Sequence, residues 1–214
     1  MSMAVDHLNG EASHHFPDAQ TEFEASKLGI WLFLCTEILM FGGLFVAYFI
    51  FHSLYPEAFM EGAKYTDWKL GAANTVVLLF SSLTIALAVH FLQKNNIKAA
   101  AVNLAITFGC AMIFMVIKAI EYSHKIHDGL LPGRWFSHAK ETAELPTYFA
   151  IYFTTTGVHG LHVLIGMGLI AWVFIRTIRG GFNSRYYTAV EGVALYWHLV
   201  DLVWIFLFPL LYLV

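Results

Sequence analysis

Two sets of polar residues that could do chemistry stand in otherwise apolar parts of the sequence, each at the spacing of one helical face. In the first set, steps of four, three and four residues separate Thr155, His159, His162 and Gly166. In the second set, steps of seven and three residues separate Glu191, His198 and Asp201. Residues spaced in this way share one side of a helix, so each set predicts a polar stripe.

Three kinds of chemistry fit histidines and carboxylates arranged in such stripes. Two histidines on facing helices can ligate a haem b and carry electrons, as in a membrane cytochrome anchor. Chains of carboxylates and histidines through a helix bundle can form a proton or ion path. The same groups can act as interhelical hydrogen bonds that fix helix packing, with His198 and Asp201 bonded to each other. The spacing alone leaves all three interpretations open.

Glu37 is a further ionisable residue, and it lies near the middle of another apolar run. An unpaired carboxylate in hydrocarbon is costly, so this residue should be neutral or hydrogen-bonded to a facing polar group. We expect its partner to be one of the three histidines His159, His162 and His198.

A separate cluster of charges follows the third apolar run. It contains Lys118, Glu121 and Lys125, whose spacings of three and four place the glutamate beside both lysines. We interpret this cluster as an ion-pair network at the membrane interface.

The remaining residues with reactive side chains are read as structural. Cys35 and Cys110 both fall inside apolar runs, so we interpret them as small core residues and not as a redox pair. Three histidines near the N-terminus, His7, His14 and His15, are candidate metal ligands that we interpret instead as tail residues.

Five long apolar runs must position all of these groups. They cover about residues 28–51, 70–92, 99–120, 148–175 and 189–214. Each is long enough to cross the roughly 30 Å hydrocarbon layer as a helix. Barrel strands would alternate in polarity, and these runs do not. The sequence therefore predicts an all-α membrane protein, with a polar tail in residues 1–25 and a bundle of five transmembrane helices in residues 26–214.

Composition and charge agree with a membrane protein. Of the 214 residues, 58% are hydrophobic and 13% are charged, about half the charged share of a soluble domain. The formal net charge of −3 provides no field for binding nucleic acid. The acidic tail has no basic residue, so it is not a signal peptide. Lysines and arginines near the helix ends favour a cytoplasmic N-terminus and a periplasmic C-terminus.

Three segments resemble motifs of subunit III of the haem-copper terminal oxidases. Residues 153–166 read FTTTGVHGLHVLIG, which is similar to the family motif F-x-x-T-G-x-H-G-L-H-V-x-x-G. Residues 196–207 read YWHLVDLVWIFL, which resembles Y-W-H-F-V-D-V-V-W-L-F-L. Residues 27–37 read KLGIWLFLCTE, which resembles K-x-G-x-x-L-F-I-x-S-E. The resemblance extends in order from about residue 26 to the C-terminus.

The resemblance implies a subunit that contains no metal or redox centre and packs on a catalytic subunit I. That subunit holds haem and copper, and subunit II belongs to the same complex, a proton-pumping oxidase that reduces oxygen to water in the bacterial inner membrane. The implied roles are to stabilise subunit I, to support proton uptake and to hold phospholipids in a cleft. The family's membrane carboxylate matches Glu37, and a basic position near a lipid head group matches Arg176.

This sequence departs from the mitochondrial pattern of seven helices, because it lacks the first two, as short bacterial members do. Lipid binding then depends on whether a neighbouring subunit supplies the missing side of the cleft. Subunit III of a quinol oxidase and the accessory subunit of a nitric-oxide reductase are alternatives within the same superfamily. The haem b anchor is the alternative from a different class.

Overall fold

The computed structural model of the protein describes residues 19–133, 136, 144–184 and 187–214. Its long helices are α2 (Ala19–Leu54), α4 (Trp68–Gln93), α5 (Ile97–His127), α6 (Leu145–Ile178) and α7 (Thr188–Tyr212). All five are long and apolar enough to cross a membrane. This confirms the predicted all-α membrane bundle. The histidines at positions 7, 14 and 15 lie outside the described residues.

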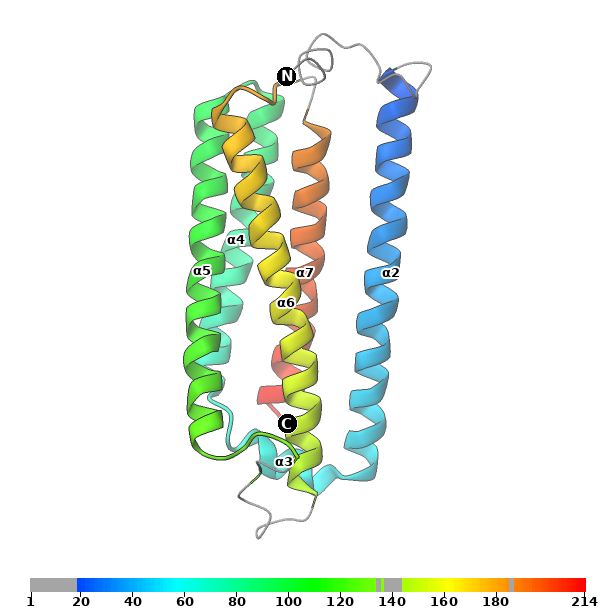
Figure 1. The fold of residues 1–214 in the computed structure, drawn as a ribbon, viewed down its shortest axis with the longest axis vertical. Helices are drawn as coiled ribbons and strands as arrows, with labels where there is room; N and C mark the ends of the chain where they lie inside the picture. The colour runs from blue at the N-terminus through cyan, green and yellow to red at the C-terminus, as the bar shows by residue number, and fades with distance from the viewer. Residues whose placement is uncertain (1–18, 134–135, 137–143, 185–186) are drawn as a thin grey trace.

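Four helices form a bundle, and the fifth stands at its side. Helices α4 to α7 pack together, with the most extensive contact between α4 and α5 (Figure 1). Helix α2 touches α7, α6 and α3, and it presents many apolar side chains outward. Cys35 is one of these exposed residues, so its predicted place in the core was wrong, whereas Cys110 is buried as expected.

The helices extend beyond most of the predicted apolar runs, because apolar content marks only the part of a helix that hydrocarbon surrounds. Helix α2 begins at Ala19, inside the segment predicted as a tail. Helix α4 begins after Asp67, whose carboxylate accepts hydrogen bonds from the backbone N–H groups of Lys69 and Leu70. Helix α5 continues to His127, because several of its last polar residues pack inside the bundle.

The short helix α3 (Pro56–Ala63), which connects α2 to α4, was not predicted. Proline in its first turn and Glu57 beside it favour a helix start at this point. Its buried Gly62 lies so close to α6 that an added Cβ would be 2.1 Å from the ring atom Cδ1 of Tyr148. Helix α3 therefore closes the bundle at the end where α7 finishes.

Two tyrosine hydroxyls hold the C-terminal end of α7. Helices leave their last carbonyl groups without a partner inside the helix. Tyr48 on α2 donates to the carbonyl oxygen of Leu210, and Tyr148 on α6 donates to that of Leu211 at 2.7 Å. These bonds join three helices at one end of the molecule, next to the polar groups described below.

Candidate functional site

The lysine and glutamate cluster of α5 lies inside the bundle. Lys118 Nζ is 2.9 Å from Glu121 Oε2, and Lys125 Nζ is 3.3 Å from Glu121 Oε1. The glutamate therefore lies beside both lysines, as the spacing predicted. Only 8% of the Lys118 side chain and 4% of the other two are exposed, so the ion-pair network is buried between the helices. The α5 face that carries them turns toward α6 and α7.

Tyrosines from two other helices complete this network. The Tyr152 hydroxyl donates to Glu121 Oε1 at 2.7 Å, and the Tyr212 hydroxyl lies 2.8 Å from the same atom. Lys118 Nζ donates to both tyrosine oxygens, at 3.0 and 2.9 Å, in addition to the glutamate. All three N–H groups of its ammonium therefore have an acceptor. A buried ion pair is tolerable only when extra hydrogen bonds of this kind satisfy its charges.

The network contains two ammonium groups and one carboxylate, so its positive charge needs further compensation. Lys125 Nζ donates to the backbone carbonyl of Tyr65 at 3.0 Å. Lys118 Nζ lies 5.1 Å from the ring centroid of Trp204 and 5.2 Å from that of Tyr122. Aromatic faces attract a cation at such distances, more strongly when water is excluded. The surrounding rings therefore offset part of the positive charge that a second carboxylate would otherwise neutralise.

Glu37 on α2 meets His162 on α6. Glu37 Oε2 is 2.9 Å from His162 Nε2, although the contact is not aligned as a linear hydrogen bond. His162 Nδ1 is 2.7 Å from the carbonyl oxygen of Val158, which can only accept, so this nitrogen carries a hydrogen. Of the three histidines considered as partners, His162 is the one that contacts Glu37.

Replacing Glu37 with leucine should lower the free energy of unfolding by about 1–3 kcal/mol, because it leaves the mostly buried His162 Nε2 without a partner. Replacement with glutamine should cost less, since the carboxamide keeps the size of the side chain and can donate to Nε2. Thermal unfolding of the detergent-solubilised chain measures both changes. Equal losses for the two variants would contradict this account of the pair.

His159 is fixed by aromatic packing instead of hydrogen bonds. Its side chain is fully buried, stacked on Trp204 at a centroid distance of 5.2 Å and edge-on to Phe114 at 5.7 Å. Neither ring nitrogen has a hydrogen-bond partner among the described residues. The predicted stripe of α6 nevertheless faces inward, because Thr155 and Gly166 are buried with it.

His198 and Asp201 on α7 do not bond to each other as the sequence analysis suggested. His198 Nδ1 is 2.6 Å from the hydroxyl oxygen of Ser82 on α4. Asp201 is 3% exposed and lies against Ser81 and Ser82, but neither of its carboxyl oxygens makes a hydrogen bond of ordinary geometry. His198 thus bonds to a serine of the neighbouring helix and not to Asp201 of its own helix. This bond links α7 to α4.

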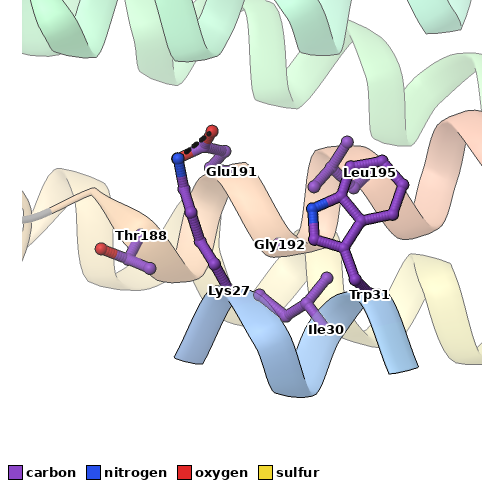
Figure 2. A pocket seen from close by; sticks show the side chains of 7 residues that line it. All are labelled: Lys27, Ile30, Trp31, Thr188, Glu191, Gly192 and Leu195. Carbon is purple, nitrogen blue, oxygen red and sulfur yellow. Dashed lines mark ion pairs between the residues drawn. The ribbon is translucent and has the colours of Figure 1, made fainter. Parts of the chain in front are cut away.

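Glu191 lies away from the three histidines, at the start of α7. Its Oε1 is 3.6 Å from Lys27 Nζ on α2, and 29% of its side chain is exposed. Figure 2 shows Lys27 and Trp31 of α2 reaching the pocket that Glu191 and Thr188 line on α7. Glu191 is thus half-buried, and it shares only its helix with His198 and Asp201. Its ion pair instead joins the end of α2 to α7.

Arg176 lies near the end of α6, at the same end of the molecule as the Lys27 and Glu191 pair. Its guanidinium carbon is 5.6 Å from the ring centroid of Trp172 and 5.0 Å from that of Phe182. Arginine stacks well on aromatic faces, because its planar group is weakly hydrated. The two rings thus hold the cation in place at the boundary of the apolar span.

These features define a class: a multi-pass helical membrane protein in which several buried polar groups bind one another across helices. The family described as Cytochrome c oxidase subunit III matches residues 7–214 of the chain. The chain belongs to this family.

Relatives named Cytochrome c oxidase subunit 3 agree with that assignment. The protein of Dugong dugon is 32% identical over 209 residues, which cover 93% of this chain and 72% of the relative. The human protein has the same identity and coverage. The protein of Prototheca wickerhamii is 32% identical over 197 residues, covering 87% of this chain and 68% of the relative.

Proposed function

We propose that this chain is the non-catalytic subunit III of a bacterial aerobic respiratory oxidase of the cytochrome c type. The observation that carries the proposal is the family match over residues 7–214. Its partners are the catalytic subunit I, which holds haem and copper, subunit II of the same proton-pumping complex, and membrane lipids. The chain lies in the cytoplasmic membrane, with its N-terminus in the cytoplasm and its C-terminus in the periplasm.

The arrangement of the ionisable groups supports a stabilising role. Glu121 binds two lysines and two tyrosines of its own chain, and His198 binds Ser82 of α4. Groups that are satisfied in this way fix how helices pack. A rigid bundle of this kind suits a subunit that stabilises subunit I during turnover and supports proton uptake into it.

The geometry of the histidines favours this function over a haem b anchor. A haem held between helices needs two imidazoles that are open to the iron. His162 Nε2 contacts Glu37, and the fully buried ring of His159 is stacked on Trp204, so neither ring faces a space for a haem. His198 binds Ser82 through Nδ1, and its Nε2 alone cannot supply two axial ligands.

Arg176 is the residue through which we propose that the chain holds a phospholipid head group. Its cation lies between Trp172 and Phe182, near the end of an apolar span. The ends of membrane spans are the usual depth of lipid phosphates. The positive charge of the guanidinium and its five N–H donors suit an anionic oxygen.

The oxidase purified without this chain should keep its haem and copper spectra and its initial rate of oxygen reduction. It should then lose activity progressively during turnover, since the catalytic subunit has lost its support. Oxygen uptake measured over repeated turnovers tests this, and adding back the purified chain is the control. Loss of the haem signal on removal of the chain would overturn the proposal.

Two further measurements separate the alternatives. Oxidation of reduced cytochrome c by the complex supports the cytochrome c oxidase assignment, whereas oxidation of quinol alone would support a quinol oxidase. A pyridine haemochrome spectrum of the isolated chain should contain no haem. One haem per chain would favour the membrane anchor instead.

A further inference from the structure

The hydrogen bond between Ser82 and His198 lies deep in the membrane-spanning part of the protein. His198 is ten residues from the start of α7 at Thr188, which is about 15 Å along the helix axis. Ser82 is eleven residues from the end of α4 at Gln93, about 16 Å along its own axis. Both positions are near the middle of a hydrocarbon layer of about 30 Å.

The second ring nitrogen of His198 reaches the surface of the chain. Nδ1 is bound to Ser82, and Nε2 has no hydrogen-bond partner among the described residues. Nε2 is not enclosed by the protein, whereas both oxygens of Asp201 and both nitrogens of His159 are. The imidazole is half-buried. This chain alone therefore leaves a polar nitrogen facing outward at the middle of the membrane.

The surface around this nitrogen is apolar. On the two helices, the neighbouring outward positions are large aliphatic residues that are 39–55% exposed: Leu79, Leu83, Leu202 and Ile205. We name this surface, together with Ser82 and His198, the α4–α7 seam. A single hydrogen-bonding group in an apolar surface at this depth is unlike the ordinary lipid-facing side of a membrane helix.

We propose that the α4–α7 seam binds a transmembrane helix of another subunit of the oxidase, which presents a hydrogen-bonding side chain to His198 Nε2. This inference rests on the proposed function, because it requires the chain to be part of a complex. A lipid acyl chain would cover the aliphatic residues, but it would leave the imidazole nitrogen unsatisfied, which is costly in hydrocarbon. A helix can satisfy both parts of the surface.

The Ser82 bond also limits the chemistry of the partner side chain. If the serine donates to Nδ1, then Nε2 carries the hydrogen and donates outward. If Nδ1 donates to the serine, then Nε2 accepts. A hydroxyl or carboxamide group can fill either role, so Ser, Thr, Tyr, Asn or Gln is the expected residue on the partner helix.

Site-specific photo-crosslinking in the purified oxidase tests the proposal. A photoreactive phenylalanine analogue replaces Leu202, an outward residue of the seam that forms no polar contact, and the adducts are mapped by mass spectrometry. The expected product joins residue 202 to a transmembrane segment of another subunit, within one helical turn of a hydroxyl or carboxamide side chain. Adducts with lipid or detergent alone, in a complex that still contains the chain, would overturn the inference and leave the proposed function intact.

A pair of substitutions at His198 tests the hydrogen bond itself. Asparagine can place its amide nitrogen near the position of Nδ1, keeping the Ser82 contact, whereas glutamine can reach the position of Nε2. The His198→Asn variant should dissociate from the detergent-solubilised complex about three- to tenfold faster than the wild type, the effect of losing one hydrogen bond between helices. The His198→Gln variant should dissociate at nearly the wild-type rate. Equal rates for all three proteins would overturn the inference, and absence of the chain from the purified oxidase would overturn the proposed function.

Discussion

Replacing Glu121 with glutamine should lower the free energy of unfolding by about 3–5 kcal/mol, the usual cost of removing one partner from a buried ion pair. The substitution keeps the size of the side chain but removes the only carboxylate that contacts Lys118 and Lys125 among the described residues. Two ammonium groups would then remain inside the bundle. Thermal unfolding of the detergent-solubilised chain, followed by near-ultraviolet circular dichroism, measures the loss.

The effect should be large because Glu121 organises three helices. Its oxygens accept hydrogen bonds from Tyr152 on α6 and Tyr212 on α7, as well as from Lys118 on its own helix. A carboxamide has one acceptor oxygen, and its NH₂ group would point two donors at groups that are already donors. The loss therefore includes hydrogen bonds as well as charge.

The exposed pair Glu61 and Lys64 provides the control. Its atoms Oε2 and Nζ are 2.7 Å apart with the same spacing of three residues, but 69% of the lysine side chain is exposed. Glu61→Gln should change stability by less than about 1 kcal/mol, because exposed ion pairs contribute little. In the background of Glu121→Gln, the further change Lys118→Met should recover part of the loss by removing one unpaired charge. Similar losses for the two glutamine variants would contradict a special role for burial.

The bundle of five spans could be predicted from the sequence because lipid imposes the same requirement on every span: a continuous apolar helix of sufficient length. The ends of the helices could not be predicted in the same way. Helix α5 runs through Glu121 and Lys125 to His127, because α6 and the turn before α4 bind these polar residues. Apolar content indicates where a helix contacts lipid, but it does not indicate where polar residues of the helix contact other parts of the protein.

Contacts within one helix could also be predicted, whereas contacts between helices could not. The spacing of three and four residues correctly placed Glu121 beside Lys118 and Lys125. It also suggested a bond between His198 and Asp201, which Ser82 of another helix replaces. Spacing shows which residues share a face, but the nearest group on the facing helix depends on how the two helices pack.

The residues that sequence reasoning missed are uncharged. Tyr152, Tyr212 and Ser82 complete the polar contacts, yet hydroxyl groups are common in membrane helices and carry no signal in hydropathy. Their positions opposite the charged residues become visible only when the helices are assembled. The partner of Glu37 could be narrowed to three histidines, and the packing of α2 against α6 selects His162.

Gly166 permits the close packing of α6 and α7, and its replacement by leucine should be among the most damaging changes in the chain. An added Cβ would lie 2.7 Å from two ring atoms of Trp197, closer than real side chains approach each other. Trp197 is fully buried, and its indole N–H donates to Ser81 at 3.0 Å, so the ring cannot move aside. Even alanine should cost about 1–3 kcal/mol at this position, as overpacking usually does, and leucine more.

Gly168 gives the matched comparison, because it lies two residues further along the same helix with nothing within 4 Å of an added Cβ. The same substitution there, Gly168→Leu, should be neutral or stabilise the helix by up to about 1 kcal/mol, since leucine favours the helical backbone over glycine. Thermal unfolding of the two leucine variants in the same detergent measures the difference. Equal unfolding temperatures for Gly166→Leu and Gly168→Leu would mean that the close contact with Trp197 does not determine how α6 and α7 pack. The inward orientation of the α6 stripe would then need another explanation.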